Sequence, residues 1–324
     1  MKKTILVIGS ASLAILFVLT ACSKNDSSNS TPVTNRDSTL QLTVVQNAAD
    51  QTIVQNDEDI LESDAGIAIK VASNLDGSVP AGSKYDITTL NGAVIDMSSL
   101  SVNNKVVKIG YGGSTVNNIT KSGNVTITLI SGSKFTDAGA VVKETFDSVA
   151  IAYNHKTRIY QGTRYIKNIA GGSRSAVSVS FPFIYSIRTS GTVTFEDKST
   201  ASYWVARRNS LSNISVNPAF PTTYASDGDS TLSGDTCSIG GTSRYGKIFR
   251  VKSAQTYAAS TNCGFAFPYQ GIRNYISDNT SIKITFGVDA NGNPVGNNTT
   301  TCAYGYNIQW TKLNGQTGLV TVAY

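Results

Sequence analysis

Acid–base or nucleophilic chemistry at neutral pH usually relies on histidine, and this 324-residue chain holds a single one, His155. A Ser-His-Asp or Cys-His site would have to use it. Its neighbours Asn154 and Lys156 are typical of a turn between strands. No Gly-x-Ser-x-Gly elbow is present. We therefore interpret His155 as a turn residue.

Glycoside hydrolysis needs two carboxyl groups on either side of the scissile bond. Among the glutamates, Glu58 and Glu62 lie one turn apart on a predicted helix, which is typical of a solvated face. Glu196 falls in a predicted hairpin turn, and Glu144 is the one remaining glutamate of the chain. The sequence thus predicts a protein that is not an enzyme, with a glycan-active hydrolase as the last alternative.

One acidic loop imitates a calcium site. Asp227, Asp229 and Asp235 have the spacing with which such a loop begins, but Leu232 stands where the sharp turn needs glycine. We interpret these residues first as turn formers and only second as calcium ligands. No cofactor is expected.

Three cysteines, Cys237, Cys263 and Cys302, follow the N-terminal region. In an oxidising compartment they allow one disulfide, in any of three pairings. We favour Cys263–Cys302, because both flank C-terminal strands that could fold back on one another. None of the three has a nearby base or the close partner that a zinc site requires.

Aromatic and arginine side chains alternate in the second half of the chain. Tyr203 and Trp204 precede Arg207 and Arg208, and aromatic faces beside guanidinium groups suit sugar rings and acidic glycans. These four residues are the ligand-binding candidates. The alternative is that the aromatic residues pack on a pleated sheet.

Charge is divided unevenly along the chain. Residues 22–150 carry 9 Lys/Arg and 14 Asp/Glu, whereas residues 151–324 carry 16 and 7. The basic distal half could meet an anionic glycan or a partner protein, although scattered surface charge that keeps a protein soluble gives the same count. No nucleic-acid recognition motif is present, so no nucleic-acid partner is expected.

The elements that must position these residues are mostly strands. Helical spacing of apolar residues is confined to residues 58–71, and from about Tyr85 the period changes to two, as in Val125–Leu129. Strands at Ile187–Phe195 and Ser202–Val205 predict a hairpin. We expect a mainly β fold, an antiparallel β-sandwich or elongated β-meander with one or two short N-terminal helices.

The N-terminal sequence predicts where the protein is localised. Leu19-Thr20-Ala21-Cys22 is a lipobox that follows a basic start and an apolar run. Residues 1–21 are therefore expected to be a lipoprotein signal peptide, with lipidation of Cys22. Residues 22–39 are expected to be a flexible tether. We expect residues 40–168 to form an N-terminal α+β part, mostly β from about 85, and residues 169–324 to form a C-terminal β part.

Two resemblances refine this view. The lipobox, with the segments Ile187–Phe195, Cys263–Gly271 and Cys302–Gly305, resembles uncharacterised β-rich lipoproteins of Bacteroidetes type. By resemblance to bacterial lipoprotein sorting, Ser23 in place of aspartate implies the outer membrane, and Lys24-Asn25-Asp26 resembles a surface-export signal. The resemblance implies an outer-membrane or surface lipoprotein with no catalytic residues to carry over.

The second resemblance is to fimbrillin-type pilins, which are lipoproteins with β-sandwich domains. Those mature by cleavage after an N-terminal arginine, and Arg36 is the only arginine before Arg158. The leading hypothesis is a membrane-anchored protein that binds glycan or a partner surface without catalysis. The alternative is a pilin-like structural subunit processed after Arg36.

Overall fold

A computed structural model describes the chain from Arg36 to Tyr324, which forms one compact unit. The residues left out within that range are 74–83, 87–91, 102–103, 117, 154–155, 173–181, 214–221, 230–236, 261–262, 264–266, 278–279, 297–301, 312–314 and 316. Residues 1–35, with the lipobox, Cys22 and most of the expected tether, lie outside the described residues, as does His155.

The described unit contains one helix, α1 (Arg36–Ser73), of 38 residues. It is longer than the short helices expected from the sequence. Polar and charged residues are interspersed with its apolar ones on every side, so no simple amphipathic stripe marks its length. No described helix is long and apolar enough to cross a membrane.

Strands make up most of the remainder. They are β1 (Lys84–Asp86), β2 (Val94–Asp96), β3 (Val106–Val116), β4 (Ile119–Ser131), β5 (Val141–Tyr153), β6 (Lys156–Asn168), β7 (Phe183–Thr194), β8 (Thr200–Asn213), β9 (Thr222–Gly228), β10 (Cys237–Thr242), β11 (Ile248–Ser260), β12 (Gln270–Ser277), β13 (Thr280–Val288), β14 (Gly305–Thr311) and β15 (Thr317–Ala323).

All 15 strands belong to a single antiparallel sheet whose order follows the chain from β1 to β15, except that β9 lies off the path and pairs with β8 and β11. The mainly β antiparallel class is confirmed, and the strand order is that of a meander. The predicted hairpin is also present: Thr194 of β7 pairs with Thr200 of β8. The two expected parts, 40–168 and 169–324, share this sheet through the pairing of β6 with β7.

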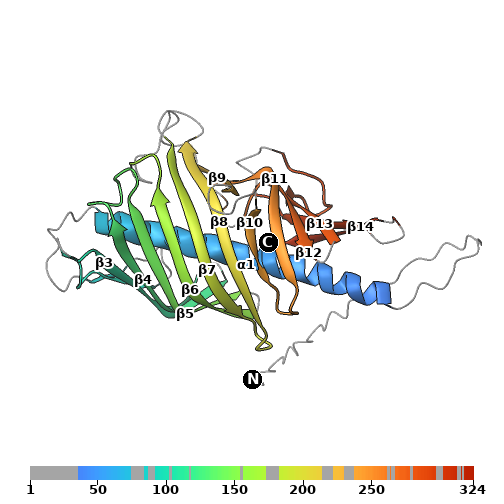
Figure 1. Cartoon of the computed structure of the whole chain (residues 1–324), viewed down its shortest axis with the longest axis horizontal. Helices are drawn as coiled ribbons and strands as arrows, with labels where there is room; N and C mark the ends of the chain where they lie inside the picture. The colour runs from blue at the N-terminus through green and yellow to red at the C-terminus, as the bar shows by residue number, and fades with distance from the viewer. Residues whose placement is uncertain are drawn as a thin grey trace, which may run out of the picture. The chain divides into compact units, whose positions relative to one another are not determined.

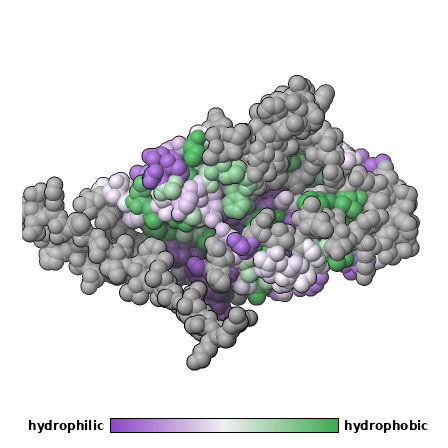
Figure 2. Space-filling view, turned by 180° about the vertical axis from the view of Figure 1, so that it is seen from behind, coloured by the Kyte–Doolittle hydropathy of each residue, from purple (hydrophilic) through white to green (hydrophobic). Residues whose placement is uncertain are grey.

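The helix lies along one face of this sheet (Figure 1). Along β6, the buried side chains alternate with outward ones, and the inner set includes Arg158, Tyr160 and Arg164. The same alternation on β8 buries Tyr203 and Arg207. The core between sheet and helix therefore mixes apolar side chains with charged ones. Seen from behind, the described surface also mixes apolar and polar residues (Figure 2).

Glycines allow strands β6, β7 and β8 to approach closely in the middle of the sheet. Gly162 pairs with Gly191, which in turn pairs with Tyr203. A Cβ atom on Gly162 would lie 2.4 Å from the carbonyl oxygen of Ser190. No larger residue fits at Gly162 without a shift of the neighbouring backbone, so the three strands can pair closely here.

The predicted disulfide is confirmed. Cys263 and Cys302 are joined, with Cα atoms 5.4 Å apart, across 39 residues of sequence. The bond links the segment that precedes β12 to the segment that precedes β14, as expected from strands that fold back on one another.

Candidate functional site

The most unusual feature of the interior is a set of carboxylates on α1 that are buried against the sheet. The acidic members are Asp50, Asp57, Glu58, Asp59, Glu62 and Asp64. Their cationic partners on the sheet and its turns are Lys121, Arg158, Arg164, Arg207 and Arg244. We call this set the ion-pair core. The expectation that Glu58 and Glu62 form a solvated face was wrong, because both are buried and paired.

Arg164 of β6 stands at the centre of the ion-pair core. Its guanidinium donates to Glu58 of α1 at 2.6 Å and to Glu144 of β5 at 3.0 Å. The Tyr203 hydroxyl donates to the other Glu58 oxygen at 2.6 Å. Glu58 thus connects α1 to both β6 and β8.

Glu144 of β5 is a buried carboxylate beside the ion-pair core, and it pairs with Arg164. Its Oε1 atom is buried and accepts no hydrogen bond from the described residues. Burial raises the pKa of Glu144 to about 7 despite the attraction of Arg164, and the negative charges of Glu62 and Glu58 raise it further. Near neutral pH this carboxyl is therefore partly protonated.

Similar bonds continue along the helix on both sides of Glu58. Toward its start, Arg158 donates two hydrogen bonds to Asp57, at 2.5 and 3.0 Å. Toward its end, the Lys121 ammonium lies 2.5 Å from Asp64. Burial raises the pKa of Asp64, and the nearby Lys121 opposes that shift.

A second group pairs α1 with the strands beyond β7. Arg207 of β8 donates to Asp59 at 2.6 Å, and its guanidinium also lies 3.5 Å from Glu62. Glu62 accepts a further hydrogen bond from the hydroxyl of Tyr185. Each acid on this stretch therefore meets a cation or a tyrosine supplied by the sheet.

The ion-pair core accounts for part of the charge asymmetry in the sequence. Four of its cations come from the basic half of the chain, and all six helical acids come from the acidic half. Within the described residues, α1 is therefore an anionic partner for the basic strands. This relationship was not predicted from the sequence. The available signal was the spacing of two, by which Arg158 and Arg164 share a strand face with Tyr160.

The four ligand-binding candidates do not share a surface. Tyr203 and Arg207 point inward and bind Glu58 and Asp59. Arg208 is exposed, and Trp204 is half-buried on the opposite face of β8. Because side chains alternate along a strand, residues 203 and 204 could not face the same ligand. The expectation of a joint site at these four residues is corrected accordingly.

Trp204 has a packing role. It pairs across the sheet with Gly240 of β10, and a Cβ atom on Gly240 would lie 2.4 Å from the indole ring. This arrangement matches the alternative in which the aromatic residues pack on the sheet.

The calcium candidates receive no support from the described residues. Asp227 accepts a hydrogen bond from Thr256 at 3.0 Å, Asp229 is buried, and Asp235 lies outside the described residues. No cluster of metal-ligating side chains occurs in the part of the chain that the structure describes. Glu196 lies in the β7–β8 turn and is exposed.

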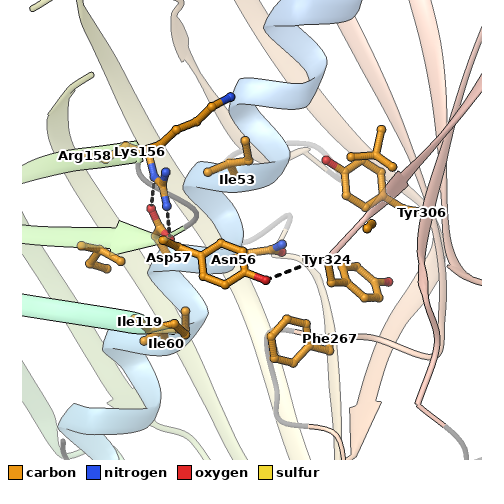
Figure 3. Close-up of a pocket in the computed structure, with 14 residues that line it drawn as sticks. Ile53, Asn56, Asp57, Ile60, Ile119, Lys156, Arg158, Phe267, Tyr306 and Tyr324 are labelled. Carbon is orange, nitrogen blue, oxygen red and sulfur yellow. Dashed lines mark hydrogen bonds and ion pairs between the residues drawn. The ribbon is translucent and has the colours of Figure 1, made fainter. Parts of the chain in front are cut away.

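A cavity of about 170 Å³ opens where the β4–β6 strands approach the segment at the end of β15. Figure 3 shows the rings of Phe267, Tyr306 and Tyr324 on one side of it, with Ile60 and Ile119 on the other. These walls are mostly apolar. A cavity of roughly 150 Å³ accepts one benzene-sized ring, so this one has room for a single six-membered ring.

Polar groups lie at the floor and the rim of the cavity. Asp57 and Arg158 are buried beneath the cavity, and their opposite charges compensate each other because they form an ion pair. The Asn56 side-chain oxygen accepts no hydrogen bond from the described residues. Lys156 is exposed at the rim, and the Tyr153 hydroxyl donates to the carbonyl oxygen of Tyr324 at 3.1 Å. Among the described lining side chains, Lys156 is the charged one without an ion-pair partner.

Comparison with family models, curated proteins and solved structures finds no match to this chain.

Proposed function

We propose that this protein is a lipid-anchored protein of the bacterial outer membrane that binds an acidic sugar ring without catalysis. The lipobox at Cys22 supports the anchor. The observation that carries the binding proposal is the ring-sized cavity with three aromatic side chains on one wall and Lys156 at its rim. This cavity takes the place of the surface expected at Tyr203 and Arg207.

The lining suits a sugar better than a wholly apolar ligand. Aromatic rings contact the C–H faces of a sugar, and Phe267, Tyr306 and Tyr324 supply three such rings. A carboxylate on the ring would meet the Lys156 ammonium. Asp57 is the single acidic side chain among the described lining residues, and glycosidase chemistry needs two. Binding is therefore the proposed function, ahead of hydrolysis.

Titration of the full-length protein with uronic-acid oligosaccharides and with neutral oligosaccharides of the same length tests this proposal. We expect binding of the acidic series to weaken about tenfold or more in Lys156→Glu, through lost attraction and added repulsion. Lys167→Glu is the matched control, because Lys167 is exposed on the same strand and lies outside the cavity lining. Ile119→Trp, which enlarges a side chain on the apolar wall, should abolish binding of both series. No binding to any acidic oligosaccharide, or unchanged binding in Ile119→Trp, would contradict the proposal.

The lipid anchor and the localisation are tested by separate experiments. Metabolic labelling with a fatty acid should mark the wild-type chain and leave Cys22→Ala unlabelled. Protease added to intact cells should digest the anchored protein if it is surface-exposed and spare it if it faces the periplasm.

One observation favours the second candidate, a pilin-like subunit. The compact unit begins at Arg36, the residue after which such a subunit would be processed. Cleavage there would release nearly the whole unit. Sequencing the N-terminus of the mature protein tests this: a start at Asp37 supports processing, and a lipid-modified Cys22 contradicts it.

A further inference from the structure

The last strand of the sheet path has an open edge. β15 pairs with β14 through seven residues, from Thr317 to Thr311 at one end and from Ala323 to Gly305 at the other. Among the described residues no strand pairs with its other edge. Such an edge presents unpaired backbone N–H and C=O groups and is a template for another strand.

This edge lacks the usual protection. Residues 317–323 contain no charged residue and no proline, which are common means of blocking an edge. Leu319 is 61% exposed and Val320 is 39% exposed, and the two point to opposite faces of the strand. At the other end of the sheet, β1 has only three residues and offers little length for pairing.

Charge argues for a second copy of the chain as the occupant. Residues 22–324 carry 25 Lys/Arg and 21 Asp/Glu, so two copies have like net charge and repel each other on average. β15 is neutral along its whole length. A self-pair about a twofold axis therefore brings two copies together where no like charges face each other.

We propose that β15 pairs antiparallel with β15 of a second copy and so continues the sheet across a twofold axis. With the axis at the middle of the strand, Val320 lies opposite Val320 of the partner subunit. Leu319 then lies opposite Thr321 of the partner subunit, where its exposed side chain gains contacts. Val322 and Ala323 of β15 also line the cavity, so the interface borders the proposed sugar site, but the pairing does not rest on sugar binding.

Cross-linking of the full-length protein in its membrane tests the pairing. Val320→Cys should give a covalent dimer with a short bis-maleimide, because the two thiols face each other across the axis. Ile248→Cys is the matched control: Ile248 is 71% exposed, but its strand β11 is paired on both edges. The wild-type chain sets the background from the native cysteines. Equal dimer yields from Val320→Cys and Ile248→Cys would overturn the proposal.

A second variant measures the association itself. Leu319→Lys/Val320→Lys places like charges across the axis and should weaken dimerisation at least about tenfold in detergent solution. Its folding is checked by the thermal midpoint, which should stay close to wild type because both side chains are exposed. A wild-type protein that is monomeric at all concentrations, or a double-lysine variant that dimerises like wild type, would contradict the pairing.

Discussion

The guanidinium of Arg164 joins Glu58 of α1 to Glu144 of β5, at 2.6 and 3.0 Å, with all three side chains buried. The helix and the sheet are therefore not held together by apolar contact alone. A buried cation between two carboxylates lets the sheet fix both the position and the rotation of α1. Such a group is costly to disturb, because removing one member leaves charges without compensation in the interior.

Replacing Arg164 by alanine should therefore lower the free energy of unfolding by about 3–5 kcal/mol, since Glu58 and Glu144 would lose their shared partner. Arg188→Ala is the matched control, because Arg188 is exposed on neighbouring β7, and its effect should stay within about 0.5 kcal/mol. Urea unfolding of both variants measures the difference. Similar losses in the two variants would show that the ion-pair core contributes little to stability.

Glu144 should make stability depend on pH in a direction opposite to that of an ordinary ion-paired acid. Its pKa is about 7 when folded, against 4.5 ordinarily, so the folded state holds an extra proton between these values. Stability therefore falls as pH rises from about 4.5 to about 7.

The variant Glu144→Gln has no titratable side chain at residue 144, so its comparison with wild type isolates the contribution of Glu144 to the pH dependence of stability. The stability of Glu144→Gln relative to wild type should increase across that window, on the order of 3 kcal/mol in total. The neighbouring buried acids, such as Asp59, titrate in both proteins, so their contribution largely cancels. Thermal midpoints of both proteins, measured from pH 4.5 to pH 8, give the comparison. A constant difference across this range would show that Glu144 is charged throughout.

The sequence predicts the features of this fold that depend on local pattern. Alternation over residues 187–195 and 202–205 marks β7 and β8, whose turn closes with a hydrogen bond from the Phe195 N–H to the Ser199 carbonyl oxygen at 2.9 Å. The order of the strands placed Cys263 near Cys302. These predictions succeeded because neighbouring strands pair with each other along the chain.

The ion-pair core could not be predicted in the same way. A glutamate on a helix is ordinarily exposed, and only the partner decides otherwise. Glu58 meets Arg164 and Tyr203, which lie 106 and 145 residues away in sequence. No local pattern carries contacts of that separation. For the same reason Tyr203 and Arg207 were predicted to bind an external ligand, whereas in the structure they bind acids of α1.

The disulfide offers a stability prediction with an internal control. Breaking it frees a loop of 39 residues in the unfolded chain, which corresponds to about 4 kcal/mol. Cys263→Ser and Cys302→Ser should each cost this amount, and the double variant should cost no more than either single one, because all three lose the same bond. Denaturant unfolding under non-reducing conditions measures the three values. Costs that add in the double variant would indicate that the two cysteines act separately.

The contact between Trp204 and Gly240 leads to a prediction about packing. A Cβ atom at residue 240 would lie 2.4 Å from the indole ring, so Gly240→Ala must push the ring aside and should destabilise the protein by about 1–3 kcal/mol. Gly318 faces Trp310 in the same manner at 2.3 Å, so Gly318→Ala should behave alike.

Combining Gly240→Ala with Trp204→Leu should recover part of the loss, because the smaller side chain makes room for the added methyl group. Gly318→Ala with Trp204→Leu should show simple additivity, because these two residues are not partners. A full double-mutant cycle on the free energy of unfolding measures this coupling. A coupling of zero between residues 204 and 240 would mean that Trp204 does not lie over Gly240 in solution, and its role as a ligand-binding residue would then have to be reconsidered.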